Sequence, residues 1–208
     1  MAEYLNYRLT QDAVLYFSGK QGVDGLFVPT AFDPKDHGKT GKPGEPRYQL
    51  RFLLPEGGVD HLAIMSKIAQ AGGGAKGPLV SGEALINQAI AKGKATPATI
   101  EKMRKTLAGK VQFSAHATEA RRPALGCFVN GVPTNLSTPD LLAAYMDRFY
   151  VGALIRVEIS AKGYTEFGGG VTGYYNSVFS HGKGERIGGS NDATAFEGLG
   201  VEAPAETF

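Results

Sequence analysis

The chain is 208 residues long, of which 42% are hydrophobic and 20% are charged, and its formal net charge at pH 7 is +2. This length suits one substantial domain and hardly leaves room for two, and the composition excludes a wholly disordered chain. No apolar run approaches the length of a membrane span, and residues 1–8 lack the pattern of a signal peptide, so we expect one cytoplasmic domain with no membrane partner.

The first part of the chain combines short β-prone runs with a long polar stretch. Residues 12–17 and 25–32 have the composition of two strands, or of one interrupted strand. Residues 33–47 are dense in Pro, Gly and Lys and are typical of an exposed loop. From 47 to 53 apolar and polar residues alternate, which predicts a half-buried strand. Its apolar face would be formed by Tyr48, Leu50 and Phe52, and its basic face by Arg47, Gln49 and Arg51.

The pattern changes to a helical one over residues 60–108. Apolar residues recur there at three- and four-residue spacing, and glycines 72–74 separate the first two of two or three helices. Thr96 and Thr138 are candidate N-caps, the first for a later helix and the second for a short helix that ends near residue 147. We therefore expect a helical insertion of about residues 60–148 in a β-rich domain.

Residues 150–179 predict a β-hairpin. Apolar and polar residues alternate over 150–162, and the glycine-rich loop GYTEFGGG leads to a second β-prone run over 171–179. One face of the first strand would therefore be core. Four further residues are expected in the core, where a lone cysteine in an apolar run is usually found. They are Phe52, Phe113, Cys127 and Phe149.

Aromatic and basic residues are interleaved in these strands and loops. Single-stranded nucleic acid is held by bases stacked on aromatic rings and by Lys or Arg side chains that meet the phosphates, so this combination predicts nucleic-acid binding. Each strand aromatic could equally be a core residue, and each loop lysine a solubilising surface group. The candidate contacts are Tyr16, Lys20, Lys35, Lys39, Lys42, Arg47, Arg51, Tyr150, Arg156, Lys162, Tyr164, Phe167, Tyr174 and Tyr175.

Fragments of catalytic and metal-binding motifs do not combine into a complete motif. Residues 38–40 resemble the end of a P-loop, but Asp33 stands where such a loop needs glycine. The four histidines have no metal-ligand spacing, and the glycine-rich stretches do not give a dinucleotide fingerprint. We therefore expect no catalytic residue, no metal site and no cofactor.

The charge is distributed unevenly along the chain. All 22 basic residues but only 16 of the 20 acidic ones lie at or before Arg186, so this part has a net charge of +6. The remaining residues contain four acids and no base, and with a carboxylate on Phe208 they would carry about −5. Their Gly, Ala and Pro content, without a regular apolar period, predicts a disordered acidic tail.

Four segments, taken in order, resemble the phage-encoded OB-fold single-stranded DNA-binding proteins of phage replication and recombination. They are LFVPTAFDP (26–34), RYQLRFLLP (47–55), YVGALIRVEISAKGY (150–164) and GVTGYYNSVFSHGKGERIGGS (170–190). The resemblance spans most of the chain. It implies a β-rich α+β fold, in which residues 1–190 form a five-stranded OB-fold barrel with the helical insertion and residues 191–208 form the acidic tail.

The resemblance also implies a function. The protein would bind single-stranded DNA in the host cytoplasm with little sequence preference and without catalysis. The tail would bind replication or recombination proteins and compete with DNA for a basic cleft lined by strands 47–53 and 150–162 and by the loops. The tail residues concerned would be Glu202, Glu206 and Phe208. A role of the insertion in forming a homo-oligomer stays open.

Two other classes of protein stay open at this point. A phage virion structural protein would also be β-rich and glycine-rich without catalytic motifs, and would assemble into particles without affinity for DNA. A nuclease or phosphoryl-transfer enzyme would need carboxylates that converge on two metal ions. The candidate carboxylates for such a site are Asp33, Asp36 and Glu45, which share one loop.

Overall fold

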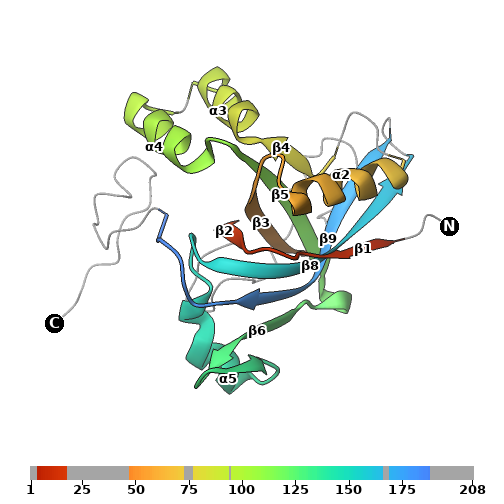
Figure 1. Ribbon diagram of the computed structural model, residues 1–208, viewed down its shortest axis with the longest axis vertical. Coiled ribbons are helices and arrows are strands. Elements are labelled where there is room, and N and C mark those ends of the chain that lie inside the picture. Colours follow the sequence, from red (N-terminus) through yellow and green to blue (C-terminus); the bar gives the residue numbers. More distant parts are fainter. Residues whose placement is uncertain (1–3, 18–46, 73–76, 94, 166–168, 188–208) are drawn as a thin grey trace, which may run out of the picture.

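Five strands of the computed structural model close into a barrel (Figure 1). The structure describes residues 4–17, 47–72, 77–93, 95–165 and 169–187. The barrel strands are β2 (Ala13–Phe17), β3 (Arg47–Pro55), β5 (Lys110–Thr118), β9 (Gly170–Ser180) and β8 (Leu154–Tyr164), in this order around the barrel. Only β5 and β9 are parallel among these neighbours, and β8 pairs with β2 to complete the circle. The predicted OB-fold barrel is therefore confirmed.

The barrel interior follows from the period-two alternation of its strands. Every second residue of β8 points inward, and Ile155, Val157 and Ile159 are almost completely buried. Phe52 of β3 stacks on Phe113 of β5, with ring centroids 5.2 Å apart. The four predicted core residues, Phe52, Phe113, Cys127 and Phe149, are all at most 1% exposed, so this prediction is confirmed.

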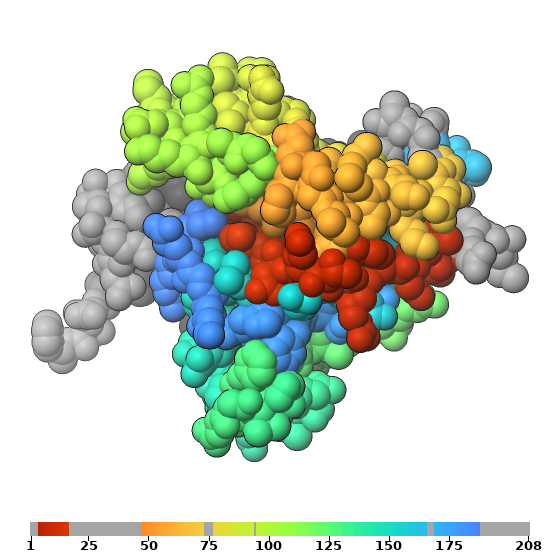
Figure 2. Space-filling model, in the orientation of Figure 1, coloured from red at the N-terminus to blue at the C-terminus, as the bar shows by residue number. Residues whose placement is uncertain are grey.

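The first strand, β1 (Leu5–Arg8), extends the sheet along β8 and is covered by helix α2 (Val59–Gln70). Figure 2 shows α2 lying directly beside β1. The buried carboxylate of Asp60 joins the two, because it accepts hydrogen bonds from the Tyr7 hydroxyl at 2.6 Å and from Thr10 and Gln11. Burial opposes ionisation, but these donors together outweigh it and lower the pKa of Asp60.

A helical hairpin is inserted between β3 and β5. It consists of β4 (Leu79–Ser81), α3 (Gly82–Ala91) and α4 (Pro97–Leu107), and the side chains of Ser81 and Thr96 cap the two helices as acceptors. The hairpin has its own small core with Leu53, Ile86 and Leu107. Gly82 is required at the start of α3, because a Cβ there would lie 2.1 Å from the carbonyl oxygen of Leu107.

The predicted helical insertion of about 60–148 is wrong in its second half. Residues 110–135 contain β5, β6 (Ala124–Val129) and β7 (Val132–Asn135), and a short 3-10 helix, η1 (Glu119–Arg121), follows β5. The inward residues of β5 include two alanines, which also suit a helix, so its strand pattern is weak. The predicted short helix is confirmed as α5 (Pro139–Tyr145), which is capped by Thr138 and followed by η2 (Met146–Arg148).

Some predicted elements lie outside the described residues. These are the strand at 25–32, most of the loop at 33–47 and the acidic tail at 191–208. Within the described part of the chain, no helix has the length and apolarity to cross a membrane.

Candidate nucleic-acid interface

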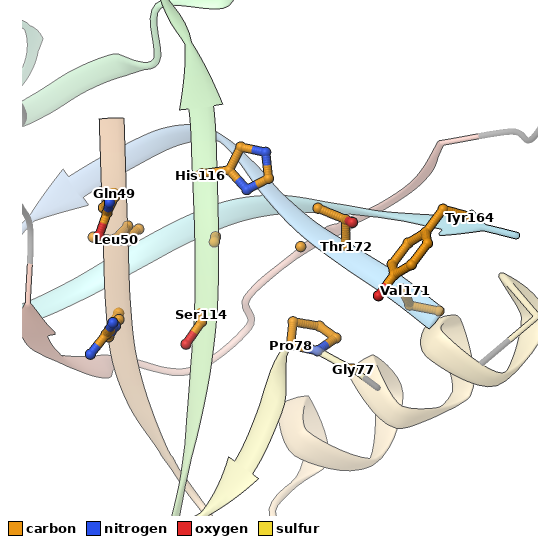
Figure 3. Close-up of a pocket in the computed structure, with 12 residues that line it drawn as sticks. Gln49, Leu50, Gly77, Pro78, Ser114, His116, Tyr164, Val171 and Thr172 are labelled. Carbon is orange, nitrogen blue, oxygen red and sulfur yellow. The ribbon is translucent and has the colours of Figure 1, made fainter. Parts of the chain in front are cut away.

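A groove of about 410 Å³ runs across the outside of the barrel over β3, β5 and the beginning of β9. Figure 3 shows Ser114 and His116 of β5 between Gln49 of β3 on one side and Tyr164 of β8 on the other. Gly77 and Pro78, which lead into β4, close one end of the groove. The groove is therefore lined by neighbouring strands that come from distant parts of the sequence.

The register of β3 against β5 decides which side chains line the groove. The inward residues of β3 are apolar, so Arg47, Gln49 and Arg51 point outward, as predicted from their alternation. They lie opposite Thr118, His116 and Ser114 of β5, respectively. A row of basic and polar groups from β3 therefore runs beside a row of polar groups from β5.

Gly173 allows β9 to approach β5 closely at the floor of the groove. A Cβ at this position would lie 2.6 Å from the carbonyl oxygen of Ser114 and 2.8 Å from the Phe113 ring. Any other residue would push the two strands apart and widen the groove.

His116 is held as a neutral ring beside a permanent positive charge. The Arg47 guanidinium donates a hydrogen bond to Nε2 of His116 at 3.4 Å, and the His116 and Tyr174 rings lie 4.6 Å apart. Burial and the Arg47 charge lower the pKa of His116 to about 4. At neutral pH the groove therefore combines a flat uncharged ring with a guanidinium.

A cluster of rings and cations continues this surface onto β8 and the residue before β1. The Tyr4 ring meets Tyr174 edge-on at 5.4 Å. The Lys162 ammonium lies 4.8 Å from the centre of the Tyr4 ring, and the Arg121 guanidinium lies 5.2 Å from it. The groove and this cluster together form the ring-and-cation surface, whose members are Tyr4, Arg47, Arg51, His116, Arg121, Lys162, Tyr164 and Tyr174.

Sequence reasoning missed three members of this surface. His116 was missed because residues 110–118 were expected to be helical; as a strand they place it on the same face as Ser114 and Thr118. Tyr4 and Arg121 gave no such signal, because the contacts of Tyr4 with Tyr174 and of Arg121 with Tyr4 form only when the chain folds.

The structure brings together five of the predicted contacts, namely Arg47, Arg51, Lys162, Tyr164 and Tyr174. Two others lie toward the other end of the β8–β9 hairpin. There the Tyr150 hydroxyl donates to the Gly184 carbonyl at 2.8 Å, and the Arg186 guanidinium lies over the Tyr150 ring. Arg156 forms an ion pair with Asp12 at 2.5 Å.

Two predicted contacts need correction. Tyr175 is only 1% exposed and points into the barrel, because neighbouring strand residues point to opposite sides and Tyr174 takes the outer one. Tyr16 points out of the barrel but packs against the small core under α3 and α4, and burial raises its pKa. The sequence pattern could not show which of the adjacent Tyr174 and Tyr175 points outward. It also could not show that the α3–α4 hairpin covers Tyr16.

The other residues of interest lie outside the described part of the chain. They are the predicted contacts Lys20, Lys35, Lys39, Lys42 and Phe167, the tail residues Glu202, Glu206 and Phe208, and the acidic loop residues Asp33, Asp36 and Glu45.

The comparisons with known proteins show a likeness in fold. No family model and no curated protein matches the sequence. Among solved structures, a C-terminally truncated single-stranded DNA-binding protein from bacteriophage Enc34 superposes with a TM-score of 0.55 at 16% identity, over 87% of each chain. The full-length Enc34 protein gives 0.47 at 14% identity, covering 93% of this chain and 97% of that one. The single-stranded DNA-binding protein gp2.5 of bacteriophage T7 gives 0.46 at 12% identity, covering 99% and 100%.

Proposed function

We propose that this protein binds single-stranded DNA on the ring-and-cation surface. One observation carries the proposal: the outer face of β3, β5 and β9 gathers aromatic rings and guanidinium groups around one groove. These are the two kinds of group that single-stranded nucleic acid requires. The fold shared with a phage single-stranded DNA-binding protein supports the same function.

The roles of the side chains follow from their chemistry. Arg47 and Arg51 meet phosphates, while Tyr164, Tyr174 and the neutral His116 ring stack on bases. Each stacked base contributes about 1 to 3 kcal/mol, and every base offers a π-face, so the binding has little sequence preference. No step of bond making or breaking is involved.

The salt dependence of binding follows from the number of phosphates met. For single strands, log K falls with log salt by about 0.7 for each phosphate neutralised. Three to five contacts therefore give a slope of about −2 to −3.5. A flat salt response would contradict this role for the basic residues.

We propose further that the acidic tail competes with DNA for the ring-and-cation surface. Its four acidic residues are attracted to the basic surface, so removal of residues 191–208 tightens DNA binding. In this scheme the tail is also the contact for replication or recombination proteins in the host cytoplasm. Unchanged affinity after truncation would argue against competition by the tail.

Fluorescence anisotropy tests the central proposal. A labelled mixed-sequence single strand, its duplex and an RNA equivalent are titrated with the full chain at two salt concentrations. We expect salt-sensitive binding that is strongest for the single DNA strand. No binding at low salt, with or without the tail, would refute DNA binding and favour a structural role.

A further inference from the structure

A second cluster of rings and cations lies at the opposite end of β9 from the groove. The Phe128 ring meets Phe179 edge-on at 5.1 Å, and both rings lie within 6 Å of His181. Phe128 lies in β6, just before the turn to β7, and its side chain is 37% exposed. A cavity of about 530 Å³ opens beside these rings.

The charge around this cavity is mainly positive. Arg148 of η2 and Lys183, which follows β9, line it together with Phe128 and His181. Two acids lie nearby, and both already face cations. Asp12 accepts from Arg156 at 2.5 Å and lies 3.3 Å from His181, while Asp147 lies 4.0 Å from Arg148. The ligand that suits this cavity is therefore an anion with flat rings.

A β-bulge places this cluster on the same side of β9 as the groove. Tyr174 and Phe179 are five residues apart, so a regular strand would point them to opposite sides. The register against β8 shifts between Tyr175 and Ser177, where Asn176 is the extra residue. As a result Tyr174 faces outward opposite Ser160, and Phe179 faces outward opposite Arg156.

The two clusters are far enough apart to be separate contacts. Thr172 lies in the groove and His181 in the second cluster, nine residues further along β9 and its continuation. At about 3.3 Å per residue, these two residues are at most about 30 Å apart, and the nearest members of the two surfaces on β9, Tyr174 and Phe179, are about 16 Å apart. A strand of about 4 nucleotides, the smallest site of an OB fold, can therefore fill the groove without spanning both surfaces.

We propose that Phe128, Phe179, His181, Arg148 and Lys183 form a second contact surface for single-stranded DNA, used only by strands long enough to leave the groove. The inference rests on the proposed function, because the same strand occupies the groove first. In this arrangement a base stacks on the exposed Phe128 ring, and Arg148 and Lys183 meet the flanking phosphates. Continuity along the outer side of β9 favours DNA over an acidic peptide as the occupant.

A tryptophan reporter tests contact at Phe128 directly. The chain contains no tryptophan, so Phe128→Trp gives a single tryptophan, whose emission can be excited apart from that of the tyrosines and is quenched by a stacked base. We expect quenching by an oligothymidine of about 20 nucleotides but not by one of about 4, because about 4 nucleotides is the smallest site of an OB fold and about 20 exceeds the largest, about 16. Val59→Trp, at an exposed position on α2, is the control and should respond to neither. Quenching by a peptide of residues 191–208 but not by the long oligonucleotide would overturn the proposal in favour of an acidic peptide.

Affinity measurements with the same two oligonucleotides give the second test. Phe128→Ala should weaken binding of the long strand about 5- to 150-fold, the equivalent of one lost stacking contact, and leave the short strand unchanged. Lys183→Ala should reduce the salt slope for the long strand alone by about 0.7. Val132→Ala is the matched control, because it is an exposed apolar residue of the same hairpin outside the cavity.

The outcomes separate this inference from the proposed function. Equal affinities of Phe128→Ala and the parent for the long strand would refute the second surface and leave groove binding intact. Equal losses for both strands would also refute it, because they would indicate damage to the groove. If the parent protein binds neither strand, the proposed function fails and the second surface fails with it.

Discussion

The inside and the outside of the barrel use the same strands under different constraints. Inside, Phe52, Phe113 and Ile155 are fully buried, so size and shape decide which residues fit. Outside, Arg47, His116 and Tyr174 belong to the ring-and-cation surface, so the charge and shape of these side chains decide which ligand they bind. Stability and binding are therefore separable in this protein at the level of alternate residues in one strand.

Truncation of an interior ring should produce the largest effect. Phe52→Ala leaves a cavity beside Phe113 and should lower the free energy of unfolding by about 3 to 5 kcal/mol. Urea unfolding followed by circular dichroism measures the loss. Thr172→Ala, on the outer side of β9, is the control and should change stability by less than about 0.5 kcal/mol. Equal losses of stability in the two variants would contradict the assignment of Phe52 to the interior and of Thr172 to the outer side of the barrel.

Tyr174 and Tyr175 are adjacent in β9, but Tyr174 points out of the barrel and Tyr175 points into it. Tyr174→Ala should weaken binding of single-stranded DNA by about 1 to 3 kcal/mol, because it removes a stacking ring from the ring-and-cation surface. Tyr175→Phe keeps the buried ring and should leave affinity unchanged. Anisotropy titrations measure both variants. A loss of affinity in Tyr175→Phe similar to that in Tyr174→Ala would contradict the assignment of inner and outer roles.

Replacement of His116 should have a smaller effect, which appears in the pH dependence of the free energy of unfolding. The folded chain lowers the pKa of His116 to about 4 from 6.5, so the unfolded chain binds the proton more readily. The contribution of the neutral His116 ring to the free energy of unfolding is fully present above pH 6.5 and is lost as the pH falls from 6.5 toward 4. Urea midpoints at pH 7.5 and pH 5 should therefore differ less in His116→Gln than in the parent. An identical difference would show that the ring does not titrate as proposed.

The smallest expected effect concerns a single phosphate contact. Arg51→Ala should reduce the slope of log K against log salt by about 0.7 and leave the unfolding transition in place. Lys92→Ala, at the exposed C-cap of α3, removes the same charge away from the groove and should not change the slope. Equal slopes for Arg51→Ala and the parent would remove Arg51 from the interface.

The sequence predicted those elements whose side chains repeat a simple period. Alternation over 150–162 and 47–53 located β8 and β3 and the correct core faces, because burial on one face of a strand repeats every two residues. β5 was missed because Ala115 and Ala117 are small enough to suit a helix as well. Period alone could not tell a helical insertion from a third barrel strand.

The candidate site could be predicted only where one strand supplies it. Arg47 and Arg51 were found, because both lie on the polar side of β3. Tyr4 was missed, because it meets Tyr174 only when β1 pairs with β8 and β8 pairs with β9. Contacts between residues so distant in the chain depend on topology, which no local pattern contains.

The position of β9 in the barrel has a consequence for synthesis on the ribosome. This strand joins β5 to β8, so the barrel cannot close until residues near 180 have left the exit tunnel. Until then the apolar inner faces of β2, β3 and β5 have no complete partner, and such exposed surfaces favour aggregation. The α3–α4 hairpin, whose small core is assembled from residues 53–107, can form earlier. We therefore expect nascent chains that end before β9 to hold a folded hairpin beside an open sheet, and to depend on chaperones until the last strand emerges.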